Sequence, residues 1–282
     1  MEGLTFAGRD GKDTLYKFRA FSDQVADSKT RVREIVLDHK VYFSRRSQLN
    51  DPFDIAPAFV LDKTGGEVET RKRLIADAKR AFERQGLSTP DINEKLALIA
   101  VRPLDWFETS ARERVLSRLE DNYFVFSLAG NRTHPMMWSH YSDSHRGLCI
   151  HFSASEPSVF SAAMKINYDP VRPQVVIPLP VEKELLQKIT LTKGNFWEYE
   201  DEYRLVRFPK QDVNFDDFGL KFETPQKALY KTPWITGITV GNRMTDSDVK
   251  EVIQMAKDHS PQLPVWKAQP TLTYELTFQQ IA

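Results

Sequence analysis

The sequence contains a single cysteine, Cys149, among 282 residues. One cysteine excludes a disulfide within the chain, and this favours a reducing compartment, so we expect a cytoplasmic protein. No apolar run approaches the roughly 20 residues of a membrane-spanning helix. The first 13 residues lack the basic start and apolar stretch of a secretion signal. We therefore expect no secretion signal and no membrane partner.

The chain also lacks an excess of charge of either sign, because 39 Lys and Arg residues balance 39 Asp and Glu residues. No overall field would draw it to nucleic acid or to an anionic membrane. The arginine clusters at 31 and 33, 45 and 46, and 71 to 73 are interpreted as solvated faces of helices and loops. Neither glycine-rich phosphate-loop pattern is present, so a bound nucleotide would have to be held by side chains.

The pattern of apolar residues indicates an α+β fold. Strand-like alternation occurs at 14–21, 40–44, 122–129 and 147–152, and most of the expected strands follow one another without an intervening helix. The segment from Ile235 to Ala268 is the exception and reads as strand, helix, strand. These features predict one domain over residues 1–282 with a largely antiparallel sheet. Residues 65–121 have a helical pattern and are expected to form an insertion or cap on this sheet.

The stretch WEYEDEYRLV at 197–206 places acidic residues directly before an apolar strand pattern. If the stretch is one strand, Glu198, Glu200, Glu202 and Arg204 line a single face, because side chains alternate across a pleat. One interpretation is a solvated strand edge in which Glu202 pairs with Arg204. The other is a reaction surface, because fixed carboxylates stabilise the positive charge of an oxocarbenium-like transition state.

Three further positions have both a structural and a functional interpretation. Asp51, in NDPFD, suits an Asx turn as well as a catalytic carboxylate. Arg19, near the end of the first strand, is either a surface residue or a ligand for a diphosphate. The histidines between 134 and 151, with Cys149, have the element types of a zinc site, but their spacing disfavours one, so we expect no metal. Cys149 and His151 share a polar strand face that would suit the border of a pocket.

Four sequence blocks resemble a widespread bacterial and phage family that is designated a domain of unknown function. The blocks are LYKFR, VYFSRRSQLNDPFD, FVFSLAGNRTHPMMWSHYSDSHRGLCIHF and WEYEDEYRLV, and together they extend over most of the chain. The order of the blocks and the WSHYxDxHxG and YExEYR patterns make this resemblance specific. It implies no function.

The chain also resembles, more distantly, the ADP-ribosyltransferase superfamily, in which NAD is the substrate. Members of the arginine-serine-glutamate group carry an Arg on the first strand, a Ser on the second and an E-x-E motif whose last Glu contacts the nicotinamide ribose. Arg19 matches the Arg, and Glu200-Asp201-Glu202 matches E-x-E. Ser44 and Ser127 both suit the Ser, and the resemblance of FVFSLAGNRTHPMMWSHY to DNA-targeting members favours Ser127. The resemblance also implies a split antiparallel sheet.

The same resemblance assigns roles to further residues. Glu202 would stabilise the cation that forms as nicotinamide leaves, while Glu200 would orient or deprotonate the acceptor. Trp138 or Tyr141 would stack on nicotinamide, and Arg19 would hold the diphosphate. The full set of candidate nucleotide-binding residues is Arg19, Ser44, Asn50, Asp51, Ser127, Trp138, His140 and Tyr141.

We therefore expect an ADP-ribosyltransferase-like enzyme that transfers ADP-ribose from NAD to a protein or nucleic-acid acceptor. A toxin or an anti-phage defence effector, with an antitoxin or a phage trigger as a further partner, fits this expectation. Two alternatives remain at this point. One is NAD hydrolysis, with water as the acceptor, and the other is a non-catalytic module that binds a nucleotide or a protein.

Overall fold

The structure is a computed structural model that describes residues 4–178, 183–208, 219–230 and 234–282. Its centre is an eight-stranded sheet with the strand order β15-β14-β13-β5-β1-β4-β10-β6. In that order the strands are Leu276–Gln280, Val265–Pro270, Ile235–Val240, Leu148–Ser153, Thr14–Arg19, Phe124–Ala129, Glu202–Arg207 and Met164–Lys165. Within this sheet β13 and β14 pair in parallel and the other described pairs are antiparallel, so the predicted α+β fold with a largely antiparallel sheet is confirmed.

Three smaller sheets surround the main one. The first joins β11 (Leu220–Phe222), β12 (Lys227–Tyr230) and β2 (Lys40–Tyr42), the second joins β3 (Ala58–Leu61) to β8 (Gln174–Ile177), and the third joins β7 (Asn167–Tyr168) to β9 (Thr192–Lys193). The last two pair in parallel. The two-residue strands of the third sheet are too short to leave a period in the sequence, and they carry two residues of the site described below.

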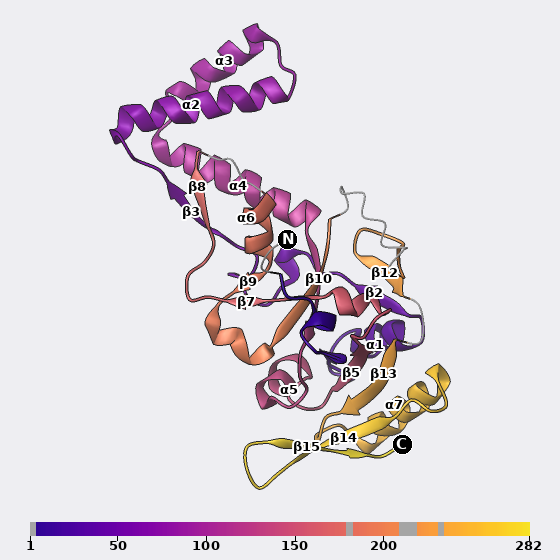
Figure 1. The fold of residues 1–282 in the computed structure, drawn as a ribbon. Coiled ribbons are helices and arrows are strands. Elements are labelled where there is room, and N and C mark those ends of the chain that lie inside the picture. Colours follow the sequence, from indigo (N-terminus) through magenta and orange to yellow (C-terminus); the bar gives the residue numbers. More distant parts are fainter. Residues whose placement is uncertain (1–3, 179–182, 209–218, 231–233) are drawn as a thin grey trace.

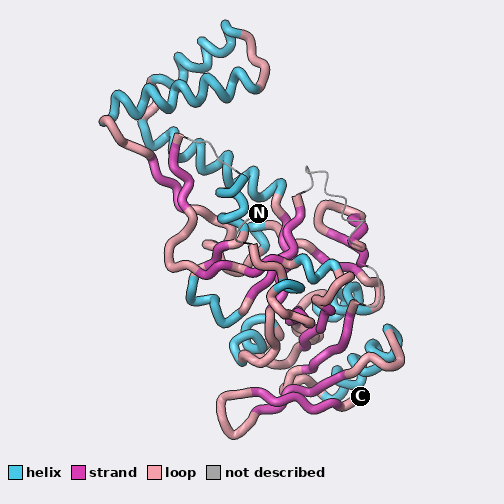
Figure 2. The backbone as a smooth tube through the Cα atoms, viewed as in Figure 1, coloured by secondary structure: helices cyan, strands magenta, loops and turns pink. Residues whose placement is uncertain are grey.

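The helices divide between the sheet and a projecting segment. Helices α1 (Ser28–Val36) and α7 (Asp246–His259) contribute to the largest core cluster, and α7 connects the parallel strands β13 and β14 as the sequence predicts. Helices α2 (Gly66–Arg84), α3 (Thr89–Ala100) and α4 (Leu104–Asn122) confirm the predicted helical segment. Figures 1 and 2 show α2 and α3 as a hairpin that extends away from the sheet.

Apolar side chains pack on both faces of the main sheet. The larger cluster includes Leu15 of β1, Phe126 of β4 and Tyr203 of β10, which therefore share one face. Smaller clusters on the opposite face include Val125 and Val206 at one end and Phe18 and Cys149 at another. Burial on both faces holds the strands in a fixed register, because a slip of one residue would move each apolar set to the wrong side.

The main sheet is split between β1 and β4, and this split forms the site. Tyr16 and Ala129 are the one pair of register partners between these strands. Further along β4, Ser44 takes the place of β1: its backbone N–H donates to the Val125 carbonyl (2.8 Å), and the Val125 N–H donates to the Ser44 carbonyl (2.9 Å). Ser127 therefore lies between the point where β4 pairs with β1 and the point where it pairs with Ser44. On this edge the stretch around Ser127 faces an opening.

The expectation of a single strand over 197–206 is wrong. Residues Asn195–Glu200 form a 3-10 helix, η4, and β10 begins only at Glu202. Between them Asp201 has a left-handed backbone (φ 44°), which turns the chain. Glu198 and Glu200 therefore do not share a strand face with Glu202. The interpretation as a solvated edge is also wrong, because β10 lies between β4 and β6 and buries Glu202 and Arg204.

The remaining helices are α5 (Pro135–Tyr141), α6 (Lys183–Thr190) and the short 3-10 helices η1 (Ala7–Arg9), η2 (Arg46–Gln48) and η3 (Val159–Ala162). Ser28 is the first residue of α1, and its hydroxyl donates to the Ser22 carbonyl (2.8 Å). Among the described residues, none of the helices combines the length and the apolar character that crossing a membrane requires.

Candidate functional site

A cavity of about 250 Å³ lies in the split between β1 and β4. Its lining brings together Arg19 from the end of β1, Ser127 from β4 and Glu202 from the start of β10. The candidates Ser44, Asn50, Tyr141 and Glu200 also line it. In an unbroken sheet Arg19 and Glu202 would lie on opposite faces, because Tyr16 and Ala129 share a face with Glu202. The split removes this barrier, so both side chains reach one space.

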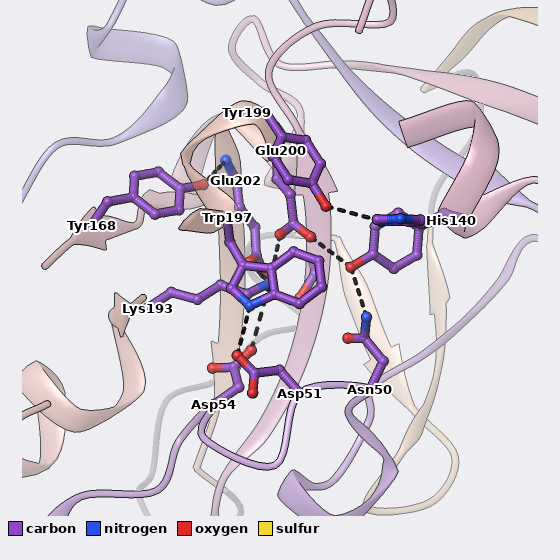
Figure 3. A network of polar contacts seen from close by, with 12 residues as sticks. Asn50, Asp51, Asp54, His140, Tyr168, Lys193, Trp197, Tyr199, Glu200 and Glu202 are labelled. Atoms are coloured by element: carbon purple, nitrogen blue, oxygen red, sulfur yellow. Dashed lines mark hydrogen bonds and ion pairs between the residues drawn. The ribbon is translucent and has the colours of Figure 1, made fainter. Parts of the chain in front are cut away.

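The acidic side of the cavity is a buried network of ion pairs, part of which is shown in Figure 3. Arg204 binds Glu202 through two contacts, Nε to Oε1 at 2.6 Å and Nη2 to Oε2 at 3.0 Å. The same guanidinium binds both carboxylate oxygens of Asp54, at 2.9 and 2.6 Å. The pairing of Glu202 with Arg204 that the sequence suggested is thus present, but Arg204 is fully buried and Glu202 is 4% exposed.

Lys193 of β9 connects the two glutamates of the E-x-E motif. Its Nζ donates to Oε2 of Glu200 (2.5 Å) and to Oε2 of Glu202 (3.1 Å), and it lies 3.8 Å from Asp54. If every group is ionised, Glu200, Glu202 and Asp54 contribute three negative charges, and Lys193 and Arg204 contribute two positive ones. The network therefore carries one uncompensated negative charge next to the cavity.

The two glutamates have pKa values shifted in opposite directions. Burial raises the pKa of Glu200, and the charge on Lys193 only partly offsets this effect. Burial also acts to raise the pKa of Glu202, but the charges of Arg204 and Lys193 outweigh it and hold that pKa below its usual value. Glu202 is therefore the carboxylate that stays ionised, and Glu200 is the one that exchanges a proton most readily.

Tyr141 of α5 orients Glu200 toward the cavity. Its hydroxyl donates to Oε1 of Glu200 (2.5 Å) and accepts a hydrogen bond from Nδ2 of Asn50 (2.9 Å). Burial and the neighbouring Glu200 charge raise the pKa of Tyr141, so its proton is retained. On the other side, the backbone N–H of Glu202 donates to the Tyr168 hydroxyl (2.7 Å), which holds the start of β10 against β7.

The basic side of the cavity is formed by β1 and contrasts with this network. Among the described residues, no carboxylate forms an ion pair with Arg19 or Lys17, and the buried Nε of Arg19 has no hydrogen-bond partner. Burial, together with the nearby charge of Arg31, lowers the pKa of Arg19 to about 10, so the guanidinium is still charged at neutral pH. An unpaired guanidinium in a cleft is suited to bind an anion.

A second cavity, of about 540 Å³, continues from the first. It shares Arg19, Ser44, Gln48 and Tyr141 with the inner cavity. Its other charged lining residues are Arg31, Glu34, Lys40 and Lys227, of which Glu34 and Lys227 pair with each other (3.0 Å). The cleft therefore runs from an acidic inner end to a predominantly basic outer part, with Arg19 at the junction.

Several predicted site residues do not line the inner cavity. Trp138 is fully buried, and its indole N–H donates to the Arg132 carbonyl (2.7 Å), so it is not placed to stack on a ligand. His140 contacts the Tyr199 hydroxyl (2.9 Å). Asp51 accepts a hydrogen bond from the Trp197 indole (2.7 Å) and one from the Phe53 N–H (2.8 Å), as expected for an Asx turn. These three residues therefore contact other side chains of the protein and do not form part of the lining of the inner cavity.

The remaining polar strand face also lies away from the cleft. His151 and Cys149 are buried, and His151 contacts Thr239 (2.9 Å) and Arg132 (3.2 Å). Neither residue lines a described cavity. Within the described part of the chain, no cluster of three or more His, Cys, Asp or Glu side chains is arranged to hold a metal ion.

Sequence reasoning missed Lys17, Lys193 and Asp54. One feature of the sequence could have identified Lys17. It shares a strand face with Leu15 and Arg19, and a lysine is unusual on the core-facing side of a strand. Lys193 and Asp54 had no such signal, because their partners lie in other strands and loops. We compared the chain with protein-family models, with curated proteins and with solved structures, and none of them matches.

Proposed function

We propose that this chain cleaves the bond between nicotinamide and ribose in NAD and transfers ADP-ribose to a macromolecular acceptor. The observation that carries the proposal is that Arg19 and Glu202, which are far apart in the sequence, line one cavity together with Tyr141. Ser44 and Ser127, the two candidates for the serine position, line the same cavity. The residues taken from the ADP-ribosyltransferase resemblance therefore converge, although only the antiparallel split sheet supports that resemblance at the level of the fold.

The two glutamates suit the two roles that this reaction requires. A pair of titratable groups whose pKa values are driven apart is typical of an electrostatic stabiliser working beside a proton acceptor. Glu202, which stays ionised and is fixed by Arg204, would stabilise the positive charge on ribose as nicotinamide leaves. Glu200, whose pKa is raised and which Tyr141 orients, would accept a proton from the acceptor.

The net charge of the ion-pair network also supports cleavage of the bond between nicotinamide and ribose. Its one excess negative charge lies at the inner end of the cleft, where the nicotinamide ribose would bind. A positively charged transition state would neutralise that charge, so the interaction strengthens as the bond breaks. Arg19 at the junction of the two cavities would bind the diphosphate, and the outer cavity would accept the adenosine part of NAD.

The test is the release of nicotinamide from NAD by the purified protein, followed by chromatography. Isotope-labelled NAD added to a cell lysate then separates the two reactions: a labelled macromolecule indicates transfer, and free ADP-ribose alone indicates hydrolysis. If NAD stays intact with the folded protein in both assays, the proposed reaction is wrong.

A second candidate, a non-catalytic nucleotide-binding module, is favoured by one observation. The acidic network is almost fully paired within the protein, as expected of a structural element that needs no ligand. Thermal denaturation tests this candidate: NAD at 100 times its dissociation constant should add about 2.7 kcal/mol to the free energy of unfolding. Such stabilisation without release of nicotinamide would support the module over the enzyme.

A further inference from the structure

The most unusual group in the inner cavity is the amine of Lys17. This residue lies in the middle of β1, and its side chain lines the cavity together with Glu200 and Glu202. Its Nζ donates a hydrogen bond to the Ser127 backbone carbonyl (2.5 Å), on the part of β4 that has no register partner in β1. The amine of this basic-wall residue thus reaches across the split to β4.

Burial opposes a charged ammonium group on Lys17. Among the described residues, no carboxylate lies within 4 Å of its Nζ, whereas Lys193 contacts three. Nζ lies over the Phe126 ring, 4.7 Å from its centroid. Burial, with the nearby charge of Arg19, outweighs the opposing charges of Glu202 and Glu200 and lowers the pKa of Lys17 well below its usual range. A desolvated lysine next to another cation is the arrangement that makes an amine nucleophilic.

We propose that Lys17 is a nucleophile that forms a covalent bond with C1′ of the nicotinamide ribose. The proposal rests on the NAD cleavage proposed above and adds an intermediate to it. It requires a ribosyl carbon at the inner end of the cleft, which is where Glu202 would stabilise its positive charge. Lys17 and the two glutamates would then act on the same atom from different walls.

The steps balance without a further reactant. The Nζ lone pair bonds to C1′, and nicotinamide leaves as a neutral molecule with the electron pair of the broken bond. The new ammonium group loses one proton to Glu200. The ribosylamine then opens: the bond from C1′ to the ring oxygen breaks, the remaining proton on nitrogen moves to that oxygen, and an imine forms. The ring then closes again by the reverse of this step, and Glu200 returns its proton to Nζ. The nucleophilic atom of the acceptor bonds to C1′, Nζ leaves as a neutral amine with the electron pair of the broken bond, and the acceptor's proton passes to Glu200.

Reductive trapping tests this intermediate, because cyanoborohydride adds hydride to the imine carbon and makes the bond permanent. We expect intact-protein mass spectrometry to show one ADP-ribose adduct per chain with NAD and cyanoborohydride, and peptide mapping to place it on Lys17. Lys17→Arg keeps the donor to the Ser127 carbonyl and should lose at least about 20-fold of the adduct. Lys95→Arg, on the exposed surface of α3, is the matched control and should keep it.

The result that overturns the proposal is nicotinamide release at the wild-type rate by Lys17→Arg, with no wild-type adduct above that variant's background. Lys17 would then be a structural bridge across the split, and the proposed function would stand. A second arm with ADP-ribose, whose open form carries C1 as an aldehyde, separates the two proposals. If the protein releases no nicotinamide from NAD but forms an adduct on Lys17 with ADP-ribose, the proposed function is wrong. The amine of Lys17 is then still shown to be reactive.

Discussion

The two walls of the inner cavity differ in how their charges are compensated. On the β10 side, Glu202 and Asp54 share Arg204, and Lys193 joins Glu202 to Glu200, so each charged group has partners within the chain. On the β1 side, Arg19 and Lys17 face the cavity without an ion-pair partner among the described residues. The charges of the acidic wall are therefore paired within the chain, whereas those of the basic wall are not. This difference predicts that substitutions in the acidic wall lower the free energy of unfolding, whereas substitutions in the basic wall weaken the binding of a ligand.

The largest expected effect comes from Arg204→Ala. This change leaves Glu202 and Asp54 buried without the cation that both contact, and breaking a buried pair in this way costs about 3–5 kcal/mol. Denaturant unfolding monitored by tryptophan fluorescence measures the loss. The control is Arg84→Ala on the exposed end of α2, which should change the free energy of unfolding by less than about 0.5 kcal/mol. Equal effects in the two variants would contradict the contrast between the walls.

Exchanging the two glutamates for glutamine should give unequal losses of stability. Glu202→Gln removes the partner that Arg204 binds at two atoms and should cost about 2–4 kcal/mol. Glu200→Gln removes the one excess negative charge, so its cost should stay within about 1 kcal/mol. The free energies of unfolding at pH 7 decide this point. If Glu200→Gln is the more damaging change, the charge balance described above is wrong.

Changing the basic wall should leave stability intact and weaken binding. Arg19→Gln removes a guanidinium that has no ion-pair partner in the described structure, so we expect unfolding to change little. Loss of one charged contact to a diphosphate should raise the dissociation constant of NAD about 10-fold to 30-fold. Isothermal titration calorimetry measures it, with Arg31→Gln as a second variant in the outer cavity and a smaller expected effect. Unchanged affinity in Arg19→Gln would remove Arg19 from the ligand site.

The smallest expected effect is a pH dependence that distinguishes the glutamates. The pKa of Glu202 is lowered on folding, so its contribution to stability is present above the unfolded value of 4.5 and is lost as pH falls below it. The pKa of Glu200 is raised, so its contribution is present below 4.5 and is lost as pH rises. As the pH rises from 4.5 to 7, the stability of Glu200→Gln relative to wild type should therefore increase. A constant difference would show that Glu200 titrates normally.

The sequence predicted the fold better than the site. The strands β1, β2, β4 and β5 and the three helices of residues 66–122 follow from local apolar periods, and the strand-helix-strand unit of β13, α7 and β14 does as well. The stretch 197–206 was mispredicted because alternation of Glu and aromatic residues suits a strand, while Asp201 in a left-handed conformation ends a 3-10 helix there. Tertiary packing determines whether this stretch forms a strand or a 3-10 helix, and the local spacing of apolar residues does not report that packing.

The site was predicted in part, for a physical reason. Arg19, Asn50, Tyr141, Glu200 and Glu202 were identified from motif positions, and all of them line the inner cavity. Trp138 was wrongly expected to face the ligand, because its helix turns the indole toward Phe18 in a buried cluster. The pairing of Arg204 with Asp54 was not predictable, since these two residues meet across 150 positions of sequence. Such a contact depends on the split of the sheet rather than on any local pattern.

The rate of nicotinamide release by Glu202→Gln, compared with wild type, tests the central claim most directly. It is measured under conditions where denaturant curves show both proteins fully folded. If an ionised carboxylate at this position stabilises the departing ribosyl cation, the variant should lose at least about 100-fold of the rate. Turnover by the folded variant at the wild-type rate would contradict the claim and leave the acidic wall a purely structural element.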